Sequence, residues 1–303
     1  MKNSRKIIGF YVVLSFFLVF FMPENKNFKK AFRTDNIMLL KFGGVRASEY
    51  GISPFPSAEE WTRYAVKMSQ KFENFEPAII WILGVTWDDG TCELSFPSDG
   101  KEYPYIEFSK KDENEEYLNF FDSRGIKVFL QVEPGNADVE TLISLVLKRY
   151  GHHSCVVGFG VDVEWYKWNE YDEGKAVSDD EALKWVNKVL SFNRNYALFL
   201  KHWEIEKMPP DYRERLIFVN DSQNLGALGQ MKIEFQNWAN FFSPSPVAFQ
   251  IGYESDKSWW QYYYDPAGTI GRELINIIPN LNGIFWVDFT LKDAFIKRKR
   301  GTR

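Results

Sequence analysis

Eight short apolar segments, each long enough for one β-strand, alternate along this chain with amphipathic segments of helical spacing. The apolar segments are residues 38–43, 78–85, 127–133, 156–164, 197–203, 216–220, 247–253 and 283–288. The amphipathic segments are residues 58–71, 113–123, 139–149, 179–193, 226–240 and 269–278. Such alternation is typical of a parallel sheet covered by helices, and eight strands are enough to close it. The sequence therefore predicts an α/β fold, a single (β/α)8 TIM barrel over residues 37–303.

A doubly wound open sheet would show the same alternation and is the main alternative. That fold usually carries a glycine-rich phosphate-binding loop after its first strand. Here Phe42-Gly43-Gly44-Val45 stands at that place and lacks the GxGxxG pattern. Capping boxes predict two helix starts, one at Ser57 with Glu60 and one at Ser178 with Glu181.

The N-terminal residues differ from the rest of the chain. Residues 1–6 are basic, residues 7–22 are almost entirely apolar, and residues 23–36 form a polar, Lys-rich linker. This order is typical of a secretory signal. No small-x-small cleavage site follows, so residues 1–22 are either a signal peptide or an uncleaved signal anchor. We expect an exported protein, extracellular or at the cell surface, that meets the membrane only through residues 7–22.

Composition narrows the classes of ligand. The chain has 41 acidic and 37 basic side chains, which argues against a nucleic-acid partner. Cys92 and Cys155 are the only cysteines, and they could pair or stay free. His152 and His153 precede a predicted strand and are expected in a loop, and the sequence shows no metal-ligand cluster. We expect no metal, no cofactor and a monomer.

The fourth predicted strand carries two acids on one face. Val157, Phe159, Val161 and Val163 alternate with glycine or acid, and the even positions end in Asp162 and Glu164. The apolar face would pack on helices, so the acids would point into the barrel. Two neighbouring carboxyls resist ionising together, which keeps one of them as a proton donor. The glycines at 158 and 160 would leave room for bulky neighbours deeper in the barrel.

Polar and aromatic residues also end the other predicted strands, at the end of the barrel where active sites of this fold lie. They are Gln131, Glu133, His202, Glu204, Asn220, Asp221, Gln250, Glu254, Trp286 and Asp288, with Trp165 and Tyr166 directly after the acids. In the last strand, Ile284, Trp286 and Asp288 would share the inward face. Acids, amides and Trp without Arg or Lys suit an uncharged, hydroxylated ligand, so a carbohydrate substrate is predicted. Core packing, helix caps and solvated loops are the structural alternatives for each residue.

The fourth strand resembles the D-G-x-D-x-D-x-E motif of family 18 glycoside hydrolases, the chitinases and endo-N-acetylglucosaminidases. Gly158, Asp162 and Glu164 match, whereas Val157 and Gly160 replace the first two acids. Residues 283–288 are similar to that family's closing strand.

The resemblance implies a role for each matching residue. Glu164 would protonate the leaving oxygen, and Asp162 would orient a substrate acetamido group that acts as the nucleophile. Asn220 or Asp221 would bind the acetamido group, and Trp286 would form the floor of the sugar site. The leading prediction is a hydrolase of N-acetylhexosamine-containing glycans.

Other interpretations stay open. The D-x-E strand also resembles family 25 lysozymes, which cleave peptidoglycan, but these have an early Asp in the first strand that residues 38–43 lack. A further scheme pairs Glu164 with a strand-seven acid such as Glu254, although Val163 stands where an Asn is usual. Loss of the two motif acids also leaves room for a barrel that binds glycans without cleaving them. A structural cell-surface barrel would bind none.

Overall fold

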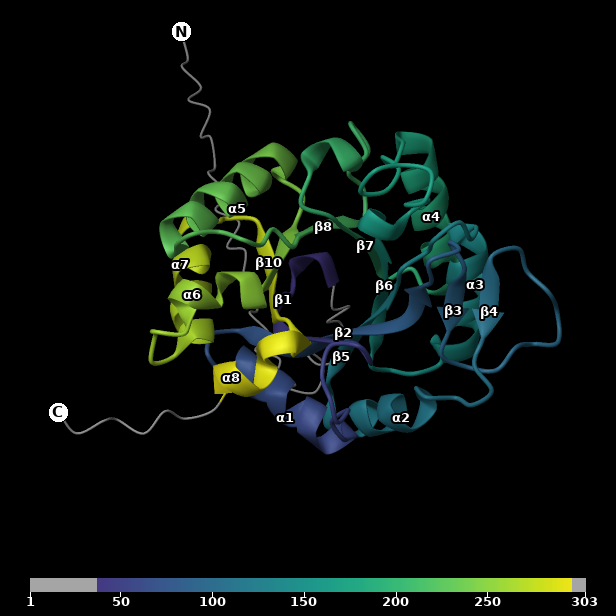
Figure 1. Ribbon diagram of the computed structural model, residues 1–303, viewed down its shortest axis with the longest axis horizontal. Helices are drawn as coiled ribbons and strands as arrows, with labels where there is room; N and C mark the ends of the chain where they lie inside the picture. Colours follow the sequence, from purple (N-terminus) through teal and green to yellow (C-terminus); the bar gives the residue numbers. More distant parts are fainter. Residues whose placement is uncertain (1–36, 296–303) are drawn as a thin grey trace, which may run out of the picture. The chain divides into compact units, whose positions relative to one another are not determined.

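The computed structural model describes residues 37–295, and these form a closed parallel barrel (Figure 1). Neighbouring strands pair in parallel around the ring, and the β1–β2 pairing closes it. The eight barrel strands of this part of the chain are β1 (Lys41–Ala47), β2 (Phe75–Thr86), β5 (Lys127–Val132), β6 (Val156–Asp162), β7 (Ala197–Lys201), β8 (Leu216–Asn220), β9 (Val247–Ile251) and β10 (Leu281–Trp286). The predicted (β/α)8 fold is confirmed.

Helices surround the strands, as Figure 1 shows. They are α1 (Ala58–Ser69), α2 (Glu115–Arg124), α3 (Val139–Tyr150), α4 (Asp179–Phe192), α5 (Leu228–Phe242), α6 (Lys257–Trp260), α7 (Pro266–Ile277) and α8 (Leu291–Phe295). Both predicted capping boxes are present, at Ser57 and Ser178. Between β7 and β8 the chain makes only the 3-10 turn η3 (Ile205–Lys207). No helix within residues 37–295 has the length and apolarity needed to span a bilayer.

A short extension of the sheet follows β2 and was not predicted. β3 (Cys92–Leu94) pairs antiparallel with the end of β2, and β4 (Ile106–Phe108) pairs with β3. Both are three-residue strands, too short for a periodic signal in the sequence. Cys92 in β3 and Cys155 before β6 are buried free thiols. The predicted signal or anchor (residues 1–22) and linker (residues 23–36) lie outside the described residues.

Apolar side chains fill the barrel interior, and glycines make room for the largest of them. The interior cluster includes Phe42, Phe129, Phe199 and Phe285. A Cβ atom on Gly160 would lie 2.0 Å from Cζ of Phe199, so only glycine fits beside that ring. The expectation that the glycines of this strand accommodate bulky neighbours is confirmed.

One residue of the fourth strand points the opposite way to the prediction. Val157 belongs to the interior cluster, whereas Phe159 and Val161 pack outside, between the barrel and the helices. The β5–β6 register shifts by one residue between Val156 and Gly158, which reverses the face that Val157 presents. Regular alternation resumes after this bulge, so Asp162 still points inward.

Candidate active site

A cavity of about 400 Å³ lies at the carboxyl ends of the barrel strands. This is within the size range of small-molecule sites. Barrel enzymes carry their catalytic groups at this end. The residues that line the cavity are Arg46, Tyr50, Val85, Thr86, Glu133, Asp162, Glu164, Trp165, Lys201, Asp221, Gln223, Tyr253 and Phe289.

The ammonium group of Lys201 holds the carboxyls of the cavity together. Its Nζ atom lies 2.5 Å from Oδ2 of Asp221, 2.9 Å from Oδ2 of Asp162 and 3.7 Å from Oε2 of Glu164. Lys201 is the last residue of β7, and its side chain is only 4% exposed. The two predicted acids therefore converge on one cation, together with the acid that follows β8.

Burial makes both predicted acids reluctant to ionise. The pKa of Asp162 is raised well above its ordinary value, chiefly by burial; Lys201 opposes this, and the carboxylate of Glu164 adds to it. Burial is also the main cause of the raised pKa of Glu164. The Glu164 side chain is 32% exposed, whereas that of Asp162 is 3% exposed. Glu164 is thus the acid that a bound molecule can reach, and it retains a proton at higher pH than an ordinary glutamate does.

A third acid forms another wall of the cavity. Glu133 directly follows β5, accepts a hydrogen bond of 2.6 Å from the Tyr50 hydroxyl, and accepts one of 3.3 Å from the backbone N–H of Thr86. Burial raises the pKa of Glu133 despite these donors. Burial also raises the pKa of Tyr50, so the phenol remains a donor.

The cavity contains two basic residues, contrary to the prediction that it would have none. Arg46 of β1 lines it and donates to Oδ1 of Asp288 from Nε at 3.1 Å and from a terminal nitrogen at 2.5 Å. Ser48 donates to the other oxygen of Asp288 from its backbone N–H and its hydroxyl, both at 2.6 Å. Asp288 does not itself line the cavity. Both cations are already paired with carboxylates, so neither supplies a free positive charge for a phosphate.

Tyr253 was not predicted and closes the floor of the cavity. Its hydroxyl donates to Oε1 of Gln250 at 3.1 Å and lies 3.5 Å from Oδ2 of Asp221. The preceding Gly252 has φ +90°, and a Cβ atom there would lie 2.2 Å from the Trp286 ring. A glycine is therefore needed for the chain to leave β9 so that Tyr253 turns into the barrel.

Trp286 was predicted to form the floor of a sugar site, and this prediction is wrong. Its side chain is fully buried on the helix side of β10, with its ring centroid 5.2 Å from that of Trp260 in α6. Its indole N–H donates to the Thr290 hydroxyl at 2.9 Å. The neighbouring Phe285 points into the barrel instead. Between the barrel and the helices, the indole packs against the Trp260 ring and donates to the Thr290 hydroxyl. The barrel interior is already filled by phenylalanine rings.

Three further candidates lie outside the cavity. Asn220 points away from the barrel axis, and its Oδ1 accepts from the backbone N–H of Ser222 at 2.7 Å. Tyr166 donates to Oε1 of Glu181 at 2.9 Å, under α4. Glu254 is 66% exposed and pairs with Lys257 at 3.0 Å, which removes the strand-seven partner of the alternative scheme. Of the predicted residues, Asp162, Glu164, Glu133, Asp221 and Trp165 line the cavity, and Gln250 lies beneath it.

The floor of the cavity also holds polar atoms that have no partner within residues 37–295. They are Oε1 of Gln131, Oδ1 of Asp162, Oδ1 of Asp221 and Nε2 of Gln250. Buried polar atoms are nearly always hydrogen-bonded in folded proteins. These four atoms are therefore available to bond water or a polar ligand that enters the cavity.

No protein-family model and no curated protein matches the sequence. Solved structures that it resembles include a β-glucuronidase of an uncultured Clostridium sp. (10% identity, TM-score 0.47) and a β-D-glucuronidase of Dictyoglomus thermophilum (11% identity, TM-score 0.48). Each alignment covers 82% of this chain and 43% of the other, so the chain spans less than half of those enzymes.

A psychrophilic family 10 endo-β-1,4-xylanase is also similar, at 10% identity and a TM-score of 0.45, over 84% of this chain and 88% of that one. The xylanase belongs to family 10 and not to family 18. At these identities and scores the likeness carries no argument about activity. The fold assignment rests on the closed strand order, and the function rests on the side chains of the cavity.

Proposed function

We propose that the chain is a glycoside hydrolase in which Glu164 is the general acid. The observation that carries the proposal is the placement of this carboxyl, accessible in the cavity, with a raised pKa and with Asp162 beside it on the same ammonium. A general acid must be protonated near neutral pH and must reach the leaving oxygen. Among the acids of the cavity, Glu164 combines a raised pKa with a side chain that a bound molecule can reach.

In the proposed reaction, Glu164 transfers its proton to the glycosidic oxygen as the bond to the anomeric carbon breaks. The oxygen of the substrate's acetamido group attacks that carbon. Asp162, whose ionised form the ammonium of Lys201 favours, accepts the acetamido N–H and stabilises the positive charge that develops. A water molecule then opens the cyclic intermediate, and Glu164 takes back a proton from it. Lys201 and Gln131 position Asp162, with Nε2 of Gln131 at 3.3 Å from Oδ2.

The substrate class is the finer part of the proposal and rests on the groups around Asp162. The family 18 motif has a Tyr-Asp pair on the sixth barrel strand, where this chain has Asn220-Asp221. Tyr253 brings a hydroxyl to 3.5 Å from Asp221 from the next strand along the chain. A Tyr-Asp pair therefore faces the cavity from two elements, which supports binding of an acetamido group. Export through residues 1–22 and action as a monomer are proposed with it.

The test replaces Glu164 by Gln, with Glu254→Gln as the matched control, since Glu254 is exposed and outside the cavity. Turnover of chitooligosaccharides or N-glycan cores should fall about 10²- to 10⁴-fold in E164Q and stay unchanged in E254Q. Aryl glycosides whose leaving group needs no proton should be affected much less. Far-UV circular dichroism checks that both variants fold. Undiminished activity of E164Q on both substrate types would refute the role.

A glycan-binding protein without turnover is the second candidate. The Phe199 ring occupies the place that a side chain at position 160 would need, so the second motif acid has no counterpart there. This candidate predicts that the intact protein retains chitooligosaccharides without hydrolysing them. Affinity should then fall in Trp165→Ala, because Trp165 lines the cavity.

A further inference from the structure

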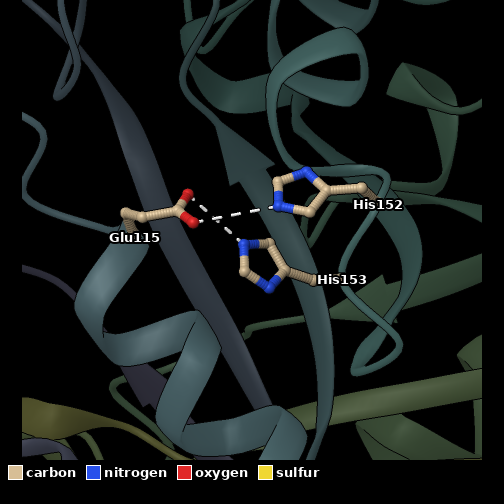
Figure 2. Close-up of side chains that lie close together, drawn as sticks. All are labelled: Glu115, His152 and His153. Atoms are coloured by element: carbon tan, nitrogen blue, oxygen red, sulfur yellow. Dashed lines mark hydrogen bonds and ion pairs between the residues drawn. The ribbon is translucent and has the colours of Figure 1, made fainter.

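Two histidines and a glutamate, none of which lines the cavity, lie close together (Figure 2). His152 and His153 lie in the loop between α3 and β6, and Glu115 is the first residue of α2. Nε2 of His152 is 3.8 Å from Oε1 of Glu115, and Nε2 of His153 is 3.4 Å from Oε2. The loop precedes the amino end of β6, whereas the cavity lies at its carboxyl end. This cluster is therefore separate from the proposed active site.

The other nitrogen of each ring is already hydrogen-bonded to an acceptor. Nδ1 of His153 lies 2.7 Å from Oδ2 of Asp122, and Nδ1 of His152 lies 2.9 Å from the carbonyl oxygen of Arg149. A carboxylate and a carbonyl have no proton to donate, so each Nδ1 must carry the hydrogen. In the neutral imidazoles, the lone pairs therefore reside on the two Nε2 atoms, which face Glu115, as Figure 2 shows.

Three electron-pair donors thus face one another, and all three lie within 4.8 Å of each other. Such an arrangement is repulsive unless something positive lies between the atoms. Extra protons on the imidazoles or a metal cation would both satisfy it. Metal-binding histidines characteristically donate their second ring N–H to a carboxylate or to a backbone carbonyl. Both forms of that support are present, one on each histidine.

We propose that Glu115, His152 and His153 bind a zinc ion, with water as the fourth ligand. Ligand atoms about 2.0–2.1 Å from a tetrahedral zinc are about 3.3 Å apart. The pair formed by His153 and Glu115 already has this spacing, at 3.4 Å. His153 is buried and held by Asp122, whereas the His152 side chain is 60% exposed and can close the remaining gap. Two imidazoles and one carboxylate suit zinc better than magnesium or calcium, which prefer oxygen.

Zinc at this place would join the start of α2 to the segment that leads into β6. Glu115 and His152, which lie in these two segments, are 37 residues apart in the sequence. The metal would replace a repulsive contact by three bonds in the folded state only. Its expected effect is therefore on stability, since any ligand that binds only the folded state raises the free energy of unfolding.

The test is calorimetric titration of the chelator-treated full chain with zinc chloride. We expect one equivalent to bind, and affinity to fall at least about tenfold in His152→Ala and in Glu115→Gln. Glu116→Gln is the matched control, because Glu116 is the exposed next residue of α2 and is not in the cluster. Magnesium chloride should not bind to this site. Zinc at 100 times its Kd should raise the melting temperature by on the order of 5 °C, and chelator should reverse this.

Two results would overturn the proposal. Absence of stoichiometric zinc uptake would mean that protons alone satisfy the imidazoles. Uptake that persists in both H152A and E115Q would place the metal elsewhere, at the carboxylates of the cavity or at a cysteine. Spectra of the cobalt form identify binding at a cysteine, because neither the proposed ligands nor the carboxylates of the cavity produce a thiolate-to-metal charge-transfer band. None of these measurements depends on the proposed glycosidase activity.

Discussion

Replacing Lys201 by Met tests whether one buried ammonium neutralises the acids of the cavity. In the folded chain its Nζ atom lies 2.9 Å from Asp162 and 2.5 Å from Asp221, and the side chain is 4% exposed. Methionine keeps an apolar stem of similar length and removes the charge. Removing one partner of a buried ion pair costs about 3–5 kcal/mol. We expect the free energy of unfolding of K201M to be lower by about this amount at pH 7.

The loss should shrink as the pH falls. Lys201 now opposes the rise in the pKa of Asp162, so its removal raises this pKa further. The folded variant therefore holds a proton on Asp162 to higher pH than the folded wild type does, and its folded-state pKa moves further from that of the unfolded carboxyl. A state that binds more protons gains stability as the pH falls. The loss should therefore be smaller at pH 5 than at pH 7.

Urea unfolding, followed by far-UV circular dichroism at pH 7, 6 and 5, measures both effects. At pH 7 the midpoint of K201M should fall by about 1–2 M for an m-value near 3 kcal/mol/M. Lys184→Met is the control, because Lys184 is exposed on α4, and it should change stability by less than about 0.5 kcal/mol. Equal losses for K201M at pH 7 and pH 5 would refute the reasoning, as would a loss below about 1 kcal/mol at pH 7.

Three further predictions concern other parts of the barrel. Burial lowers the pKa of His202 from 6.5 to about 4. Between pH 6.5 and pH 4 the unfolded imidazole is protonated and the folded one is not, so the free energy of unfolding of the wild type should fall by roughly 3 kcal/mol over this range because of His202. Urea unfolding of His202→Gln should show a smaller loss over that window, and an identical loss would contradict the assignment. Trp286→Phe should lower the melting temperature and the free energy of unfolding, the latter by roughly 1–3 kcal/mol, and should leave glycan affinity unchanged. Trp165→Ala should weaken glycan affinity by roughly tenfold, because Trp165 lines the cavity. If calorimetry showed that Trp286→Phe weakens glycan binding and Trp165→Ala does not, Trp286 would belong to the binding site. Gly160→Ala should lower the free energy of unfolding by about 1–3 kcal/mol, because the added Cβ atom would overlap the Phe199 ring. Adding Phe199→Leu should restore part of this stability in thermal unfolding. If it restores none, the Phe199 ring is not the cause of the destabilisation.

Local patterns made the barrel and part of its site predictable. Strand spacing, the capping boxes at Ser57 and Ser178, and the alternation before Asp162 each depend on a few neighbouring residues. Side chains two positions apart on a strand share a face whatever the rest of the fold does. Glu164 was predicted to lie on the same side as Asp162, two positions earlier, and it does line the cavity. It belongs, however, to the 3-10 turn η2 (Val163–Trp165) and not to the strand itself.

Lys201 shows a limit of that approach. It continues the inward series of Ala197 and Phe199 on β7, so the sequence did contain the signal. The prediction took His202 and Glu204 as the polar end of this strand instead. His202 is buried at the side, where its ring accepts from the backbone N–H of Glu204 at 2.8 Å. A strand end that is displaced by one residue exchanges the two faces, and the pattern of one strand does not locate its end that closely.

By itself, the sequence determined the fold class, the positions of most strands and helices, and one pair of acids on an inward face, because these follow from contacts between near neighbours. Tertiary structure alone decided which charges meet. Arg46 pairs with Asp288 from the other end of the sequence, Tyr253 reaches Asp221, and Glu115 faces His152 and His153 across two elements. Closing the barrel brings the first and last strands together and sets the register between them. The electrostatics of the cavity and of the proposed zinc site depend on such distant pairs, which no local pattern contains.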